Sequence, residues 1–417
     1  MKLIVQDLET FIVATPPPGK GGRYFTFVKI QTSEGLVGYG EPYGIPYGPA
    51  ASKAVIQDVF DRHLRGHSAF DIEAFWRRAY SACFSQRPDP SIMGAAAGLE
   101  MALWDLVGKH VGQPVYNLLG GKVEETLRAY TYLYPDAEDK HNLAYSDASV
   151  AAERAIYYRD LGFDALKFDP AGPYTIYDPC QPSYQDLKFI EHFVATLREA
   201  VGESTDLLFG THGQFTPSGA RQIAQVMEPF APRWFEEPTP PENPAAMAEV
   251  ARSTTIPVAT GERLCTSYEF ATVLKAGAAS ILQPALGRAG GILAAKKIAA
   301  LGEAYQAVIA PHLYAGPIEA LANVHLGLSI PNFFIAEMIE RMDGFHADLL
   351  TDPIQIAKGR IQAPTKPGLG ADLNEDFARE NPYQGDLLHL EMLDKRIWTG
   401  VNLPGMNTNT LFYGSKA

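Results

Sequence analysis

The sequence predicts an α/β protein built around a parallel (β/α) barrel, with α+β structure before it. Three polar residues, His212, Glu236 and Glu262, are spaced by 24 and 26 residues. This spacing is the length of one strand plus one helix, which is the repeat of a (β/α) barrel. Each residue also follows a short apolar run (DLLF, PRWF or PVAT). We therefore expect the three side chains to lie where barrel strands end, at one mouth of the barrel.

Residues 126–365 alternate short apolar runs with helical patterns. Eight of these runs are expected to be strands, and eight is the number that closes such a barrel. The expected strands are 127–133, 164–168, 206–210, 233–236, 257–260, 280–284, 307–310 and 333–336.

Residues 1–125 are predicted to form an α+β domain. An extended segment, 2–15, is followed by a second, 24–41, in which alternating apolar positions flank a turn at SEG. Three patterns with helical spacing come next, and Gly112 can end the last of them. The helices are expected at 50–66, 70–84 and 91–112.

Length and composition limit the classes of protein to consider. A chain of 417 residues exceeds a typical single domain, and we expect residues 366–417 to fold back on the first domain. No membrane span or signal peptide is recognisable. The net charge of −13 disfavours nucleic acid and anionic membranes as partners. Three scattered cysteines, Cys83, Cys180 and Cys265, argue against a disulfide framework and for a reducing cytoplasm.

Two long loops are candidates for substrate binding. One, 134–149, follows the first barrel strand, and the other, 169–186, follows the second and is rich in Tyr and Pro. Long ordered loops at the carboxyl ends of barrel strands commonly shape a pocket. A contact between subunits is the alternative for both loops.

The three strand-end residues indicate a metal site. Oxygen and nitrogen ligands from successive strands can converge on one hard divalent cation. For Glu236 the alternative is a solvated surface pair with Glu237, which the flanking Trp-Phe and Pro disfavour. For Glu262 the alternative is a salt bridge with Arg263.

Several segments match the motifs of a known family. GAAAGLEMALWDLVGKHVGQPVYNLLGG, WFEEP, ATGERL and PHLY occur in order, between a GYGE hairpin and PGLGADL. Together they resemble the mandelate racemase subgroup of the enolase superfamily. The resemblance implies a modified TIM (β/α) barrel with an N-terminal α+β capping domain that the C-terminal segment completes. It also implies a dimer or octamer that acts on a small-molecule carboxylate, in many relatives a sugar acid.

The chemistry of that family explains why a metal is needed. Its members remove the proton next to a carboxylate, which places a second negative charge on an anion. A divalent cation offsets this charge by contacting the enediolate, and acidic side chains hold the cation. The resemblance implies Mg²⁺, with Mn²⁺ as an alternative, and its fourth- and fifth-strand ligands match Glu236 and Glu262.

The resemblance also assigns roles to other strand ends. His312, after the seventh strand, matches the family's histidine base, and a neutral imidazole suits proton abstraction. Lys167 matches the lysine near the substrate carboxylate, and Glu337 matches a carboxylate that hydrogen-bonds the substrate. A core histidine and a snorkelling lysine are the alternatives for His312 and Lys167.

The chain departs from the family at two positions. Gly210 stands where an aspartate ligand is expected, and Ala285 stands where an aspartate would orient His312. His212 matches the histidine that protonates the departing β-hydroxyl in the family's galactonate dehydratases. The metal shell can be completed by His212, by Asp169 from the second strand, or by water. Asp169 also stands where racemases carry a second lysine, which argues against a two-base racemase.

The sequence therefore predicts a Mg²⁺-dependent lyase that dehydrates a sugar acid. A cycloisomerase or a racemase/epimerase acting on a sugar acid or its lactone is the alternative, followed by a non-catalytic sugar-acid-binding or structural descendant. An aldolase with Lys167 as a Schiff-base amine is a more distant alternative. Lys20, Tyr43 and Tyr47 lie in loops whose family counterparts close over the barrel mouth, so we expect them to contact substrate. Exposed surface loops are the alternative for these three residues.

Overall fold

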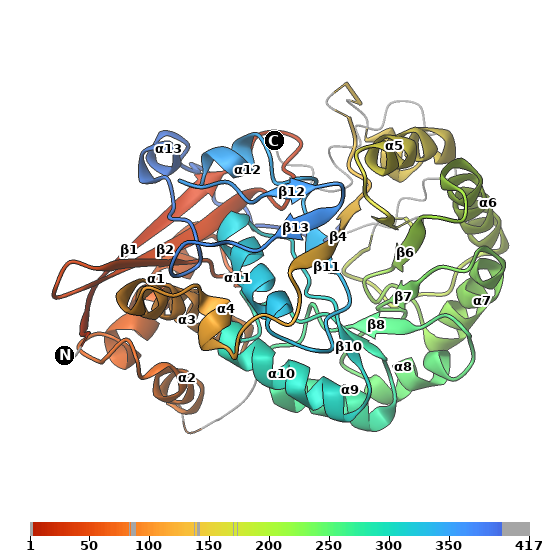
Figure 1. Cartoon of the computed structure of the whole chain (residues 1–417). Helices are drawn as coiled ribbons and strands as arrows, with labels where there is room; N and C mark the ends of the chain where they lie inside the picture. Colours follow the sequence, from red (N-terminus) through yellow and green to blue (C-terminus); the bar gives the residue numbers. More distant parts are fainter. Residues whose placement is uncertain are drawn as a thin grey trace.

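Figure 1 shows the computed structural model of the chain, with the capping domain beside the barrel. The structure describes residues 3–393 apart from 83, 85–88, 137, 140, 141, 170 and 173. Both predicted parts are present, and a cap made from the N-terminal region and the returning C-terminal segment confirms the predicted fold class.

The capping domain is a three-stranded antiparallel sheet covered by helices. Its elements are β1 (Val5–Ala14), β2 (Tyr24–Thr32), β3 (Val37–Gly40), α1 (Pro49–His63), α2 (Ile72–Ser81), α3 (Pro90–Val111) and α4 (Val115–Leu118). β2 and β3 form the predicted hairpin, whose turn contains Gly35 with φ of 87°. α3 packs directly on β3. The two backbones are so close that a Cβ at Gly40 would lie only 1.8 Å from the carbonyl oxygen of Gly98. The small residues of the GAAAG segment allow this close approach.

Helix α3 has clear sequence signals at both ends. The Asp89 side chain accepts hydrogen bonds from the backbone N–H groups of Ser91 and Ile92, which satisfies two donors of the first turn. Gly112 ends the helix in the left-handed conformation, with φ of 69°, as predicted.

Eight parallel strands among the described residues form the barrel. They are β4 (Thr126–Tyr132), β5 (Ala165–Phe168), β6 (Asp206–Gly210), β7 (Trp234–Glu236), β8 (Val258–Thr260), β9 (Ile281–Leu282), β10 (Val308–Ile309) and β11 (Ala336–Met338). They pair in order from β4 to β10, and β11 pairs with β4. The Phe334 N–H donates to the Ile309 carbonyl at 2.8 Å, which closes the barrel. The predicted strand 333–336 spans this junction, so Glu337 lies inside β11 and not after it.

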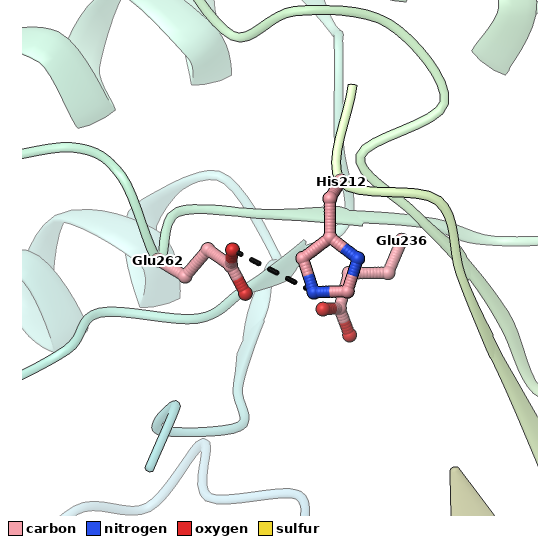
Figure 2. Close-up of side chains that lie close together, drawn as sticks. All are labelled: His212, Glu236 and Glu262. Carbon is pink, nitrogen blue, oxygen red and sulfur yellow. Dashed lines mark ion pairs between the residues drawn. The ribbon is translucent and has the colours of Figure 1, made fainter. Parts of the chain in front are cut away.

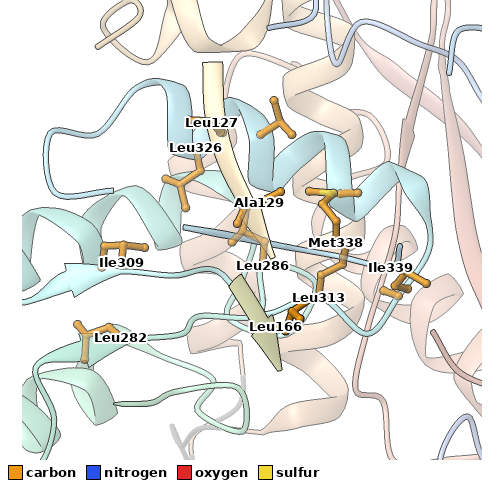
Figure 3. Close-up of a cluster of buried hydrophobic side chains, with 14 of the residues drawn as sticks. Leu127, Ala129, Leu166, Leu282, Leu286, Ile309, Leu313, Leu326, Met338 and Ile339 are labelled. Carbon is orange, nitrogen blue, oxygen red and sulfur yellow. The ribbon is translucent and has the colours of Figure 1, made fainter. Parts of the chain in front are cut away.

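Helices surround the strands on the outside of the barrel (Figure 1). They are α5 (Ala148–Asp160), α6 (Tyr184–Val201), α7 (Pro217–Met227), α8 (Pro244–Ala251), α9 (Ser267–Ala276), α10 (Ile292–Ala304) and α11 (Pro317–Leu328), with short 3₁₀ turns η1 (Leu143–Tyr145) and η2 (Glu228–Phe230). Alternate strand side chains face them, and Figure 3 shows Leu127, Ile309 and Met338 in this outer core with Leu326 of α11. The intervening side chains fill the barrel interior, which contains Tyr130 and Trp234.

The described residues after β11 contact both the barrel and the cap. They include α12 (Phe345–Asp348), α13 (Glu375–Glu380) and the hairpin of β12 (Ile356–Ala357) and β13 (Arg360–Gln362), which pairs with the start of β4. The Ala14 N–H donates to the Asn381 carbonyl and the Tyr383 N–H donates to the Ile12 carbonyl, both at 2.9 Å. The described part of the C-terminal segment is therefore joined to β1. Residues 394–417, the rest of this predicted segment, lie outside the described residues.

Within the described ranges, no helix combines the length and the apolar character that a membrane crossing requires. Cys265 is a buried free thiol, while Cys83 lies outside the described residues.

Candidate metal centre and active site

A cavity at the carboxyl ends of the barrel strands brings most of the predicted site residues together. Its volume, including the part that is open to solvent, is about 650 Å³. The predicted residues that line it are Tyr43, Lys167, Asp169, His212, Glu262, His312 and Glu337. Lys20 is not part of the lining; its Nζ lies 2.8 Å from Glu340 Oε2. Tyr47 is 47% exposed and also lies outside the lining.

His212, Glu236 and Glu262 are close enough to share one metal ion (Figure 2). Each offers a ligand atom, and these atoms lie within 4.8 Å of one another. Glu262 is only 8% exposed, and its Oε2 makes no hydrogen bond with the described residues. An unpartnered buried carboxylate oxygen is unfavourable, and a cation would satisfy it. Carboxylates and imidazoles are common ligands of divalent cations, so these three residues are suited to hold a metal ion.

The turn after β6 aims His212 into the cavity. The Glu237 carbonyl accepts hydrogen bonds from Thr211 Oγ1 at 2.8 Å and from the Gly213 N–H at 2.7 Å. His212 has φ of 49°, a left-handed conformation that non-glycine residues seldom adopt. Contacts with the neighbouring strand therefore hold a strained backbone that places this imidazole.

The solvated-pair alternative for Glu236 and the Arg263 salt-bridge alternative for Glu262 are both wrong. Glu236 and Glu237 are both buried. Arg263 Nε lies 2.8 Å from Glu237 Oε2, so Arg263 pairs with Glu237 and not with Glu262. The neighbouring acid therefore has its own counter-ion, and Glu236 and Glu262 remain for the site.

Lys167 is a buried cation in contact with two acids. Its Nζ lies 2.6 Å from Glu236 Oε1 and 3.5 Å from Glu337 Oε1. Gln283 Nε2 donates to Glu236 Oε2 at 2.7 Å, and Glu337 Oε2 accepts from the Leu313 N–H at 2.9 Å. Burial alone would lower the pKa of Lys167, but the two carboxylates outweigh it and raise the pKa well above its usual value. This excludes the snorkelling alternative and disfavours a Schiff-base amine, which must be neutral.

His312 faces the same cavity from the residues after β10. Its Nε2 lies 3.5 Å from Glu262 Oε2, and Asn323 Nδ2 donates to its carbonyl at 3.1 Å. Its Nδ1 has no hydrogen-bond partner among the described residues. Ala285, which stands where the family has an orienting aspartate, contacts His312 through a backbone bridge. Burial lowers the pKa of His312, which keeps the imidazole neutral near pH 7. A neutral imidazole beside the cavity can accept a proton.

His212 and Glu262 hold opposite charges in this site. Burial by itself would lower the pKa of His212, but the negative charges of Asp169 and Glu262 raise it to about 9. Burial would raise the pKa of Glu262, but the two histidines and Lys167 bring it well below its usual range. The charges of these groups therefore depend on one another, because the Glu262 carboxylate lies between the two histidines.

Aromatic residues that the sequence analysis did not single out form much of the cavity wall. They are Tyr132, Tyr134, Tyr145, Tyr174 and Tyr314, and the aliphatic Leu390 completes the lining. The ring centroid of Tyr174 lies 4.6 Å from that of His212, and Tyr43 lies 5.6 Å from His312. Tyr134, Tyr145 and Tyr174 come from the two long loops, whose length and Tyr content were the signal for a pocket.

His389, from the described part of the C-terminal segment, also reaches this wall. The His389 ring contacts those of Tyr24, Tyr43 and Tyr314, with centroids 5.7, 5.5 and 5.9 Å apart. The Arg23 N–H donates to the His389 carbonyl at 3.1 Å. Residues 23–24 and 389, far apart in the sequence, therefore meet beside the cavity, a contact for which the sequence offers no local signal.

Comparison with known families gives two matches along the chain. Residues 149–377 match the enolase C-terminal domain-like family. Residues 19–120 match the N-terminal domain of the mandelate racemase / muconate lactonizing enzyme family.

Individual relatives cover nearly the whole chain. A D-galactonate dehydratase from Xanthomonas oryzae pv. oryzae is 35% identical over 368 residues, which are 85% of this chain and 91% of that protein. A crystal structure of a mandelate racemase/muconate lactonizing enzyme from Labrenzia alexandrii shares 56% sequence identity, with a TM-score of 0.91 over 94% of this chain and 99% of that one. A dehydratase structure from Salmonella enterica serovar Typhimurium shares 30% identity, with a TM-score of 0.84 over 91% and 98%.

Proposed function

Because the chain belongs to the mandelate racemase and muconate lactonizing enzyme family of the enolase superfamily, we propose that it is a Mg²⁺-dependent lyase that removes water from a sugar acid. The identity of 35% to curated D-galactonate dehydratases supports this reaction and disfavours a non-catalytic descendant. The expected substrate is a small polyhydroxy carboxylate.

One observation carries the proposal. The Glu262 carboxylate lies near both the candidate base, His312, and a candidate metal ligand, His212. Glu262 Oε1 lies 4.0 Å from His212 Nε2, while Glu262 Oε2 lies 3.5 Å from His312 Nε2. A substrate whose carboxylate is held at the metal would thus place its α-carbon within reach of His312. This juxtaposition is what removal of an α-proton requires.

The chain's own residues can carry out the proton transfers. His312 Nε2 accepts the α-proton as the C–H bond breaks, and the electron pair moves toward the carboxylate. When bound, the metal supplies positive charge beside that carboxylate. Lys167 adds a second fixed positive charge, and Glu337 lies within 3.5 Å of it. Loss of the β-hydroxyl as water then needs one proton, which either protonated His312 or His212 can supply.

A screen of sugar acids tests this function directly. The purified protein with Mg²⁺ should convert at least one acid, with D-galactonate tried first, to a 2-keto-3-deoxy acid. The Glu236→Gln variant should lose this activity. A protein that dehydrates no sugar acid at high enzyme concentration would contradict the proposal. Ring opening of a lactone or an anhydro-sugar acid is also an elimination, so a ring-opened product would favour the cycloisomerase alternative.

A further inference from the structure

Position 210 shows why the last residue of β6 supplies no ligand. A Cβ on Gly210 would lie 2.3 Å from Asp169 Oδ1 and 3.5 Å from Lys167 Cε. The first distance is far shorter than a Cβ keeps from a neighbouring atom, so a side chain here would require the Asp169 carboxylate to move. A carboxylate from the end of β5 therefore fills the space beside the end of β6.

Asp169 directs its other oxygen toward His212. Asp169 Oδ2 lies 2.8 Å from His212 Nδ1, at contact distance although without hydrogen-bond alignment. The second ring nitrogen, Nε2, points the other way, toward Glu262 Oε1 at 4.0 Å (Figure 2). Histidines that bind metals usually donate their remaining N–H to a carboxylate, which fixes the tautomer and the ring orientation. Asp169 and Glu262 lie on opposite sides of the His212 ring, in the places that this arrangement requires.

We propose that His212 is the third metal ligand, through Nε2, and that Asp169 is the residue that positions it. The pair replaces a direct carboxylate ligand at position 210. The inference rests on the proposed function in one respect, namely that a metal binds at this place. Oxygen ligands suit Mg²⁺, whereas an imidazole favours Mn²⁺ and later transition metals relative to Mg²⁺. The site therefore prefers Mn²⁺ over Mg²⁺ more strongly than a site with carboxylates alone.

This assignment also settles the proton transfers of the proposed reaction. With Nε2 on the metal and Nδ1 facing Asp169, His212 has no nitrogen left to protonate a leaving hydroxyl. The proton that His312 removed from the α-carbon is then returned by His312 to the β-hydroxyl. Both transfers take place on one face of the substrate, because they use one imidazole.

Pulsed electron paramagnetic resonance of the protein with Mn²⁺ alone tests the ligand assignment without any substrate. Bound Mn²⁺ should show the modulation of a directly coordinated imidazole nitrogen, which should change when the protein contains ¹⁵N-histidine. The modulation should be lost in His212→Asn, whose amide oxygen can still bind metal. It should persist in the matched variant His312→Asn, which removes the other cavity histidine. Circular dichroism checks that each variant folds.

The Asp169→Asn variant tests the positioning role. Loss of a carboxylate behind a metal-bound histidine typically weakens metal binding by about 10- to 100-fold. We expect Mn²⁺ affinity to fall by this factor in calorimetric titrations, with nitrogen modulation still present at saturating Mn²⁺. An Asp169→Glu variant should recover part of the affinity, because it keeps the acceptor.

Several results would overturn the inference. They are a wild-type protein that does not bind Mn²⁺, bound Mn²⁺ without nitrogen modulation, and modulation that survives in His212→Asn or disappears in His312→Asn. Unchanged Mn²⁺ affinity in Asp169→Asn would refute the positioning role. A protein that shows the His212 signal but dehydrates no acid would refute the proposed function alone.

Discussion

Lys167 Nζ lies 2.6 Å from Glu236 Oε1, and both side chains are almost fully excluded from solvent. The ammonium group thus contacts a carboxylate that the candidate metal would also contact. The Lys167 ammonium group and the candidate metal would both neutralise the Glu236 carboxylate. The stability of the protein should therefore respond to the metal more strongly when Lys167 is absent.

The Lys167→Met variant tests this relationship. Removing one partner of a buried ion pair typically destabilises a protein by about 3–5 kcal/mol, since the remaining charge is left uncompensated. Chemical denaturation in a chelator should show this loss, and adding Mn²⁺ should restore more stability than it does in the wild type. Lys297→Met is the control, because its pair with Glu73 is about half exposed and should contribute less than about 1 kcal/mol. Equal metal responses in wild type and Lys167→Met would contradict the prediction.

Gly210→Asp should destabilise the protein less when Asp169 is removed. The new side chain would clash with the Asp169 carboxylate and add a like charge beside it, so we expect a loss of about 1–3 kcal/mol. In the double variant with Asp169→Ala the two changes should be non-additive by about 1 kcal/mol or more. A double-mutant cycle by urea denaturation measures this coupling. Additive effects would show that the two positions do not compete for the same space.

The double variant should also shift the metal preference. It offers a carboxylate directly to the metal and leaves His212 without its partner. We expect the ratio of Mg²⁺ to Mn²⁺ affinity to increase relative to the wild type, as measured by competitive titration. An unchanged ratio would mean that His212 does not set the preference.

Activity should decline only in acid. Burial lowers the pKa of His312 below its ordinary value of about 6.5, and a nearby metal would lower it further. As the base, His312 must be neutral, so kcat/KM should be constant above about pH 6.5 and fall at lower pH. His312→Asn should reduce kcat at least about 100-fold while Mn²⁺ binding is retained. An acid limb centred above pH 7 would argue against His312 as the base.

Stability should also fall in acid, for a separate reason. His325 is fully buried, its Nδ1 accepts from the Tyr116 N–H at 3.1 Å, and burial lowers its pKa to about 4. The unfolded state binds a proton near pH 6.5, so the contribution is complete above that value and is lost as pH falls toward 4. From these two values we expect a loss of about 2 kcal/mol between pH 7 and 5. Denaturation at both pH values should show a shallower dependence in His325→Gln, but not in the exposed control His192→Gln.

Lys20 and Tyr47 should differ in their effect on substrate binding. Lys20 pairs with Glu340 and lies 5.8 Å from the ring centroid of Tyr134, which lines the cavity. Lys20→Met should therefore loosen this part of the wall and raise KM several-fold with a smaller change in kcat. Tyr47→Phe should leave both constants unchanged, because Tyr47 lies outside the cavity. A larger effect at Tyr47 than at Lys20 would reverse this ranking.

The sequence was most informative where a local pattern decides the structure. Apolar runs at a regular spacing predicted the strands that carry His212, Glu236 and Glu262, because a parallel barrel brings strand ends to one mouth. The family resemblance, and not the spacing, indicated that an acid is missing at Gly210. It could not show that Asp169 fills the space, because that depends on two side chains from different strands.

Contacts between distant segments were beyond the sequence for a similar reason. Nothing near Leu390 resembles a site, and its place in the cavity wall follows from the return of the chain along β1. The sequence also did not predict the ion pair between Arg263 and Glu237, since Glu236, Glu237 and Glu262 were all possible partners. In both cases tertiary packing made the choice.

The meeting of His389 with Tyr24 and Tyr43 has a consequence for how the protein is made. Domains generally fold as units during synthesis, starting from the N-terminal part. Here the cap hairpin and the barrel can form while the ribosome is still translating, but the cavity wall needs residues near the end of the chain. A polypeptide stalled before residue 381 would therefore hold the candidate metal ligands with one side of the pocket unbuilt. Competence for catalysis should appear only after residues 381–390 have been translated, so the synthesis of this late segment sets the time at which the pocket becomes complete.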